Sequence, residues 1–327
     1  MTCDKWQVGN DRLSLVTCHL SPATVFLPLA KLTKETLHLE DREEQAPRPV
    51  MTFSPGMKIW LLIALNFACA GILQLMASSG SFVWLGAGPD DGYPVYFGWL
   101  AIAISSIIVF AIPAVVFANV FPPERFKWFR LGVKVHPLSL VYGMLAMLCA
   151  VLAFDLIASW IGDWITDPAL KDLQDLGDKK TVWLMQMPTV VDLLSCLFVS
   201  AFLPALCEEL FFRAGLQQLF QEWTKRPHFA VFIAAGYFSL LHFNPSGFPV
   251  IFLGGLMLGY AFYWSGSLRV GILMHFMFNA SSILISYFAQ HSPAFAQWEP
   301  SVALSLGGLG LSGLFMFLLW KQTRKGN

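Results

Sequence analysis

The chain has 327 residues, of which 56% are hydrophobic and only 13% charged, and its 21 basic and 21 acidic side chains cancel. Soluble domains carry about 25% charged residues, so this composition is typical of a membrane protein. Because the charges balance, no basic surface for nucleic acid is predicted, and we expect no nucleic acid partner. The six cysteines form no CxxC pair, so neither a disulfide framework nor a zinc ribbon is predicted.

The first fifty residues differ from the rest of the chain. Residues 1–50 are polar, contain the charged run HLEDREEQAPRP and lack the long apolar core of a secretory signal. We expect a disordered or cytosolic extension here and a transmembrane domain over residues 51–327. Because Met51 opens the stretch that leads into the first apolar segment, we hypothesise that translation starts there. Mass spectrometry of the native N-terminus would decide, and a peptide spanning residues 1–50 would contradict the hypothesis.

The rest of the chain is a series of apolar stretches separated by turn-forming residues. A bilayer core about 30 Å thick needs about 20 apolar residues in a helix, and we count about eight candidates, of which the fifth and sixth are short. They cover residues 57–79, 95–121, 137–159, 189–220, 228–243, 248–265, 268–289 and 302–320. We therefore expect an all-α, polytopic membrane helix bundle, an integral multi-pass protein surrounded by membrane lipid.

Loop charges predict the orientation of these helices, because Lys and Arg collect on the cytoplasmic side. Basic residues follow the second, fourth, sixth and eighth stretches, whereas the intervening loops are acidic or neutral. Both termini are therefore predicted to face the cytoplasm. In the acidic loop before residue 189, Leu170, Leu173 and Leu176 have the spacing of an amphipathic helix. We expect this helix to lie on the membrane surface, with a substrate gate as the alternative.

Small residues predict where helices approach each other closely. The runs Gly255-xxx-Gly259 and GGLGLSG at residues 307–313 both lie within apolar stretches. Small side chains let the backbones of neighbouring membrane helices come into contact. We expect helix–helix contacts at both runs.

Two adjacent acids and an arginine interrupt the fourth apolar stretch, at Glu208, Glu209 and Arg213. An ionisable side chain at bilayer depth is costly unless it is paired or faces water. Residues four apart share one face of a helix, so Glu209 and Arg213 are predicted to pair, whereas Glu208 points about 100° away. One acid is thus neutralised and the other remains available. The alternative is that the whole group lies near the cytoplasmic end and extends into water.

Two other stretches each place polar or aromatic side chains one helical turn apart. FSLLH contains Phe238 and His242, and HFMFN contains His275 and Asn279. Each pair shares one face of its helix. Helix tilt and kinks could bring the three groups to a similar depth, so we expect them to form one site.

The ordered set EELFFR, FSLLH and HFMFN resembles the motifs EExxxR, FxxxH and HxxxN of the CAAX protease and bacteriocin-processing family, also called the type II CAAX prenyl endopeptidase or Abi family. The resemblance covers about residues 200–280, and the signature residues match without departure. It implies an intramembrane endopeptidase or a close relative of one. It leaves the substrate open, because the family includes prenyl-protein processors, peptide-maturation factors and immunity factors.

Hydrolysis of a peptide bond needs an activated water, stabilisation of the oxyanion and a proton for the leaving amine. We assign water activation and proton delivery to Glu208 with His242. His275 and Asn279 are expected to donate hydrogen bonds to the oxyanion. Supporting roles fall to Glu209, Arg213 and Phe238, of which Phe238 is expected to pack rather than react. The expected substrate is a hydrophobic, lipidated or membrane-associated peptide or protein.

A metal-dependent mechanism is the alternative use of the same side chains. Glu208, His242 and His275 could hold zinc and leave a fourth position for water, as in catalytic zinc sites. The HExxH arrangement is absent from the sequence. We therefore favour glutamate chemistry that requires no cofactor, with zinc as the alternative.

Two other functional classes remain open at this stage. A transporter could use the motif residues as a proton or cation relay, extended by Asp155 and Asp192. A non-catalytic immunity or scaffold protein could retain the fold. Substitution of Glu208 by Gln would separate the three classes, because an enzyme loses cleavage, a carrier loses flux and a scaffold keeps its phenotype.

Overall fold

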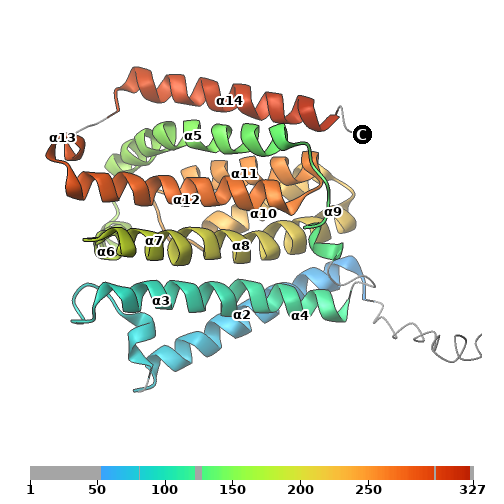
Figure 1. Ribbon diagram of the computed structural model, residues 1–327. Coiled ribbons are helices and arrows are strands. Elements are labelled where there is room, and N and C mark those ends of the chain that lie inside the picture. Colours follow the sequence, from blue (N-terminus) through green and yellow to red (C-terminus); the bar gives the residue numbers. More distant parts are fainter. Residues whose placement is uncertain (1–52, 81, 122–126, 298–299, 325–327) are drawn as a thin grey trace, which may run out of the picture. The chain divides into compact units, whose positions relative to one another are not determined.

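The computed structural model describes residues 53–80, 82–121, 127–297 and 300–324, and within these ranges every regular element is a helix. The chain divides into two units, Met1–Pro49 and Val50–Asn327. The expected extension over residues 1–50 and the hypothetical start at Met51 lie outside the described residues. The second unit, shown in Figure 1, contains all the helices considered below.

Seven helices of the described residues are long and apolar enough to cross a membrane. They are α2 (Pro55–Ser78), α3–α4 (Val95–Val120), α5 (Pro137–Trp164), α7–α9 (Val190–Thr224), α11 (Phe248–Ser265), α12 (Leu268–His291) and α14 (Val302–Arg324). Each coincides with a predicted stretch. Only 17% of the most apolar part of α2 and 22% of that of α14 is buried inside the protein, which leaves wide apolar faces for lipid. The prediction of a polytopic membrane helix bundle is confirmed.

The eighth predicted span is a shorter helix, α10 (Pro227–Leu240), of 14 residues. At about 1.5 Å per residue it is about 21 Å long, less than the thickness of a bilayer core. Phe243 adopts a positive φ of 47°, and the residue before Pro245 is biased away from helical conformation. The chain therefore turns here, and α11 runs back beside α10. Of the eight spans predicted, seven correspond to long helices of the described residues and one to the shorter helix α10.

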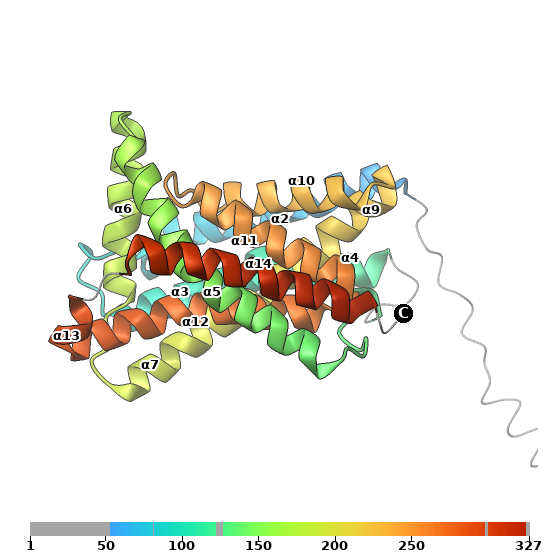
Figure 2. The same ribbon diagram turned by 90° about the horizontal axis from the view of Figure 1, so that it is seen from above.

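Figures 1 and 2 show successive long helices running in opposite directions, with α8 and α12 between the α5–α14 pair and the α2–α4 pair. At one end of the unit, the segment after α4 contacts the turn between α11 and α12. The Leu268 amide donates to the Arg130 carbonyl at 3.4 Å, and Gln218 donates to the Trp128 carbonyl at 3.0 Å. The basic residues of these loops are thus gathered at one end, while α6 lies at the other end (Figure 1).

The predicted amphipathic helix is present as α6 (Pro168–Leu184), and it is longer than the leucine spacing indicated. Asp167 caps its first turn by accepting a hydrogen bond from the Leu170 amide at 3.1 Å. Only Trp183 of this helix is buried, and Trp99 donates to the Leu184 carbonyl at 2.7 Å. The last turn of α6 is therefore fixed to α3, while the remainder is exposed.

Both small-residue runs lie at close helix contacts, as predicted. A Cβ atom on Gly255 would lie 3.1 Å from the Ala235 Cβ, and one on Gly259 would lie 2.8 Å from Val231 Cγ1, both on α10. In the second run only Gly308 makes such a contact, because its added Cβ would lie 2.6 Å from the Cys149 carbonyl oxygen of α5. The other glycines of that run have no described neighbour within 4 Å of an added Cβ.

Candidate active site

The two adjacent glutamates lie at the end of α8 (Leu203–Glu209), in the middle of the continuous helix 190–224. This helix widens into π-helical turns on both sides of them, at Leu197–Phe202 (η4) and Leu210–Gln217 (η5). Pro204, just after the first widened turn, has no amide hydrogen to donate to a preceding carbonyl. π-Helical turns inside α-helices are frequent at functional sites.

Glu209 and Arg213 form the ion pair predicted from their spacing. Arg213 Nη1 lies 2.7 Å from Glu209 Oε1, and the two side chains are 1% and 0% exposed. Arg213 Nη2 also donates to the Gly255 carbonyl of α11 at 3.3 Å, and its guanidinium carbon lies 4.7 Å from the centre of the Phe238 ring. A buried charge is tolerated when it is paired and hydrogen-bonded in this way.

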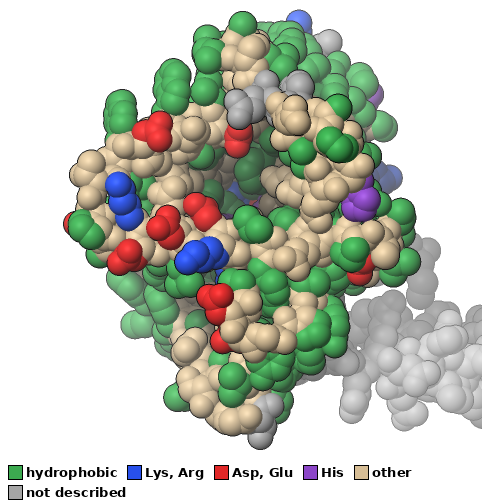
Figure 3. Space-filling view, turned by 90° about the vertical axis from the view of Figure 1, so that its left-hand side faces the viewer, with side chains coloured by type: hydrophobic (Ala, Val, Ile, Leu, Met, Phe, Trp, Pro, Cys, Tyr) green, Lys and Arg blue, Asp and Glu red, His purple; other side chains and the backbone are tan. Residues whose placement is uncertain are grey.

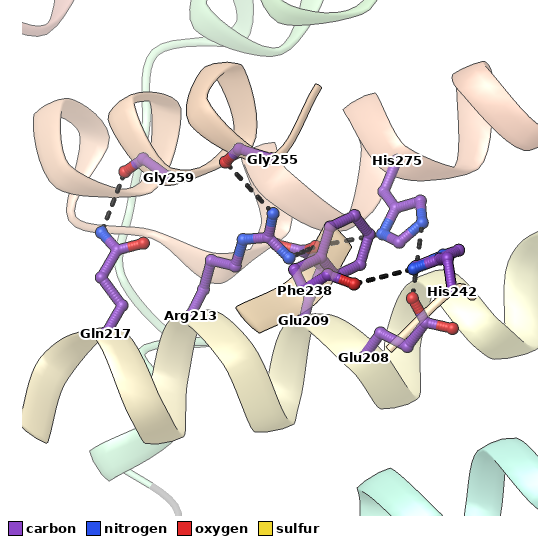
Figure 4. Close-up of polar contacts among 9 residues, drawn as sticks. All are labelled: Glu208, Glu209, Arg213, Gln217, Phe238, His242, Gly255, Gly259 and His275. Atoms are coloured by element: carbon purple, nitrogen blue, oxygen red, sulfur yellow. Dashed lines mark hydrogen bonds and ion pairs between the residues drawn. The ribbon is translucent and has the colours of Figure 1, made fainter. Parts of the chain in front are cut away.

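His275 of α12 connects the two acids. Its Nδ1 donates to Glu209 Oε1 at 3.0 Å, and its Nε2 lies 3.8 Å from Glu208 Oε2 (Figure 4). Carboxylates only accept hydrogen bonds, so the bond to Glu209 fixes a hydrogen on Nδ1. Gly271, one turn earlier on α12, makes room for this contact, because a Cβ there would lie 2.7 Å from Glu209 Oε2.

His242 lies just beyond the end of α10. Its Nδ1 donates to the Phe238 carbonyl at 2.8 Å, which leaves Nε2 as an acceptor in the neutral ring. The Phe238 ring centre lies 4.7 Å from that of His242 and 5.6 Å from that of His275. Phe238 therefore packs against both imidazole rings and against Arg213.

Glu208, His242 and Asn279 line one cavity of about 330 Å³ between α3, the π-helical turn η2 (Ser106–Ala111) that follows it, α8 and α12. The Glu208 side chain is 12% exposed and that of His275 5% exposed, so Glu208 borders the cavity while His275 lies behind it. The remaining lining is apolar apart from serines, among them Ser105, Ser106, Ser200 and Ser282. A polar cavity of this size has room for water. The structure thus brings the predicted site residues from three helices together.

Two contacts of the site were not predicted from the sequence. One is the Glu209–His275 hydrogen bond, which depends on α12 lying beside α8. The other involves Gln217, which is 1% exposed and donates to the Gly259 carbonyl at 3.0 Å. The spacing of Glu209, Arg213 and Gln217, at intervals of four residues, is a signal that could have identified this third polar residue.

The arrangement does not supply the three-ligand set that the zinc alternative requires. Among the described residues, no three His, Cys, Asp or Glu side chains lie close enough together to hold a metal ion. Glu208 and His275 face each other at 3.8 Å (Figure 4), and the bond from His242 Nδ1 to the Phe238 carbonyl leaves the His242 Nε2 free. The proposals below therefore rely on the side chains alone.

Fold and site together define a multi-helix membrane protein with a carboxylate–histidine site inside its bundle. Residues 190–281 match the family model of the type II CAAX prenyl endopeptidase Rce1-like family. This match contains all three motifs and confirms the family resemblance drawn from them.

Comparisons of the chain with curated proteins and with solved structures give two further results. An uncharacterized protein of Bacillus subtilis (strain 168), YyaK, is 27% identical in an alignment of 188 positions that covers 52% of this chain and 55% of the relative. The chain thus spans about half the length of the curated relative that it matches. No solved structure matches the chain.

Proposed function

We propose that this protein is a glutamate-type intramembrane endopeptidase that cleaves a hydrophobic, lipidated or membrane-associated peptide or protein. One observation carries the proposal: Glu208, His242 and Asn279 face the same cavity, while the second acid is neutralised by Arg213. A site of this kind has one reactive carboxylate and a position for water. The match of residues 190–281 to an endopeptidase family supports the same reaction class.

In the proposed reaction, Glu208 and His242 activate a water molecule in the cavity. The Nε2 atom of His242 can accept a hydrogen bond from this water because Nδ1–H is already donated to the Phe238 carbonyl. The Glu208 carboxylate takes a proton as the water oxygen attacks the peptide carbonyl carbon. Glu208 then gives the proton to the leaving nitrogen as the C–N bond breaks, so the acid returns to its starting state.

Asn279 of α12 lines the cavity and donates to the oxyanion, while His275 of the same helix lies behind it, with its Nε2 3.8 Å from Glu208, and contributes positive charge. His275 Nδ1–H is donated to Glu209, so Nε2 carries a hydrogen only in the imidazolium form. In that form the cations Arg213 and His275 balance the two glutamates. When Glu208 takes the proton, the negative charge moves to the oxyanion and the net charge of the cluster stays the same. Donors that are already positioned in a water-poor site stabilise such charge strongly.

A Glu208→Gln variant tests the reaction. Membrane peptides would be compared from cells that lack the gene and from cells that express the wild type or the variant. We expect cleavage products that depend on the wild-type chain to fall by about 10²- to 10⁴-fold in the variant, because the proton acceptor is lost.

The matched control is Glu222→Gln, which changes an acid of the same long helix that lines a different cavity. This control should leave the products unchanged. Unchanged products from a Glu208→Gln protein present at the wild-type level would contradict the peptidase proposal.

A further inference from the structure

A second and larger cavity adjoins the cavity lined by Glu208, His242 and Asn279, which we call the catalytic cavity. It measures about 590 Å³ and lies between α5, the start of α11, α12 and α13 (Pro293–Ala296). Ser282 of α12 lines both cavities. A third cavity, bordered by Asp163 and by Lys171 and Asp175 of α6, adjoins the second one at Ala158. These cavities form a series from the catalytic cavity toward the α6 end of the unit, where the space-filling view shows a hollow (Figure 3).

A polar stripe on α12 follows the same direction. His275, Asn279, Ser282 and Ser286 are spaced by four, three and four residues, so they share one face of the helix. Ser282 and Ser286 both line the second cavity, with apolar neighbours such as Phe278 and Ile285. The stripe is about 16 Å long, which is the length of about five residues of extended polypeptide. Its hydroxyl groups can hydrogen-bond the backbone of a chain lying along it.

Asp155 brings one carboxylate into this otherwise mostly apolar cavity. It lies within the membrane-spanning part of α5 and its side chain is exposed to the cavity. Asp155 makes no hydrogen bond or ion pair with another described residue. Asp192, the other acid considered for a relay, caps α7 by accepting hydrogen bonds from Thr189. An acid within a membrane helix is costly and marks a functional site when no structural role accounts for it.

We propose that the second cavity binds an extended, apolar segment of the substrate polypeptide that carries a Lys or Arg, and that Asp155 accepts this cation. The identity of the occupant as substrate rests on the proposed function. A carboxylate attracts a cationic side chain and repels a free C-terminal carboxylate. The occupant is therefore a segment other than the free C-terminus of the substrate, with its cation within about five residues of the scissile bond.

The test measures binding rather than cleavage, in the full chain carrying Glu208→Gln and purified in detergent micelles. The probes are short fluorescent Leu/Ala peptides that differ at one central position, which is Lys, norleucine or Glu. Fluorescence anisotropy gives their affinities. We expect the Lys peptide to bind about fivefold more tightly than the norleucine peptide, as for a partly exposed ion pair. Asp155→Asn should abolish this preference, and Asp155→Lys should transfer it to the Glu peptide.

Asp163→Asn is the matched control, because it removes an acid of the same helix that lines the third cavity instead. The preference for Lys should survive this change. Absent binding, equal binding of all peptides, or a Lys preference that persists in Asp155→Asn would overturn the proposed subsite. None of these results decides the peptidase proposal, which is judged by cleavage with an intact Glu208.

Discussion

At the scale of single residues, the two adjacent glutamates have opposite environments. Neighbouring side chains on a helix diverge by about 100°, so Glu209 points into the protein and Glu208 toward the cavity. Glu209 is fully buried and contacts Arg213 and His275. Glu208 borders the cavity, and its one ion-pair partner among the described residues is His275, at 3.8 Å. The first residue is suited to hold the site together and the second to react.

This difference predicts effects of very different size from the same substitution on the free energy of unfolding. Glu209→Gln leaves the buried Arg213 charge uncompensated, and we expect it to lower the free energy of unfolding by about 3–5 kcal/mol. Glu208→Gln loses only the longer approach to His275, at 3.8 Å, and should lower the free energy of unfolding by less than about 1 kcal/mol. Both values can be measured by unfolding in mixed detergent micelles, followed by tryptophan fluorescence.

A double variant provides the control for the ion pair. Glu209→Gln combined with Arg213→Met removes both charges, so it should be less destabilised than Glu209→Gln alone. Equal destabilisation by the two single glutamate substitutions would contradict the assignment of separate roles.

Local spacing accounts for what could be predicted at this scale. The Glu209–Arg213 pair follows from an interval of four residues, which places both side chains on one face of any helix. The bonds to His275 and to the carbonyls of Gly255 and Gly259 could not be predicted, because they depend on which helices are neighbours. Every residue has a backbone carbonyl, so the sequence does not indicate which carbonyl accepts a hydrogen bond.

At the scale of elements, apolar length predicted the helices well and their internal geometry poorly. The long spans were recognisable because each contains enough consecutive apolar residues to cross a bilayer. The π-helical turns before and after Glu208 were not predicted. The side-chain directions expected for Glu208 and Glu209 assumed a regular α-helix throughout. The short α10 also depends on context, because its early end at the Phe243 turn leaves His242 beside the cavity that Glu208 and Asn279 line.

The contact between α5 and α14 permits a prediction within one run of glycines. A Gly308→Leu side chain would collide with the Cys149 carbonyl, since its Cβ alone would lie at 2.6 Å. The backbone cannot move aside without separating the two helices. We expect the substitution to lower the free energy of unfolding by at least about 1–3 kcal/mol, as overpacking does. The midpoint of thermal unfolding in detergent reports the change.

Gly307→Leu is the matched control, because no described atom lies within 4 Å of an added Cβ at that position. This neighbouring substitution faces open space and replaces glycine by a better helix former. It should leave the midpoint unchanged or raise it. A larger loss from Gly307→Leu than from Gly308→Leu would show that α14 is rotated relative to α5.

At the scale of the whole molecule, charge is separated between the two ends of the helical unit. Arg130, Lys225 and Arg269 lie in or beside the connections at one end, and α6, with its aspartates, lies at the other (Figures 1 and 2). The sequence could predict this separation because alternating loops must lie on alternating sides. It could not predict the cavities, of which the first two are lined in part by the turn between α10 and α11.

The charge separation predicts the orientation of the protein in the membrane. Cytoplasmic loops are enriched in Lys and Arg, so the connection between α9 and α10 should be cytoplasmic and α6 should be on the opposite side. Single cysteines would be introduced as Lys225→Cys and Asp172→Cys into a chain whose own cysteines are replaced by serine or alanine. In intact cells, a membrane-impermeant maleimide should label position 172 and not position 225. Permeabilised cells are the control, because both positions are exposed and both should then react. Labelling of position 225 alone in intact cells would reverse the orientation and place the approach to Asp155 on the cytoplasmic side.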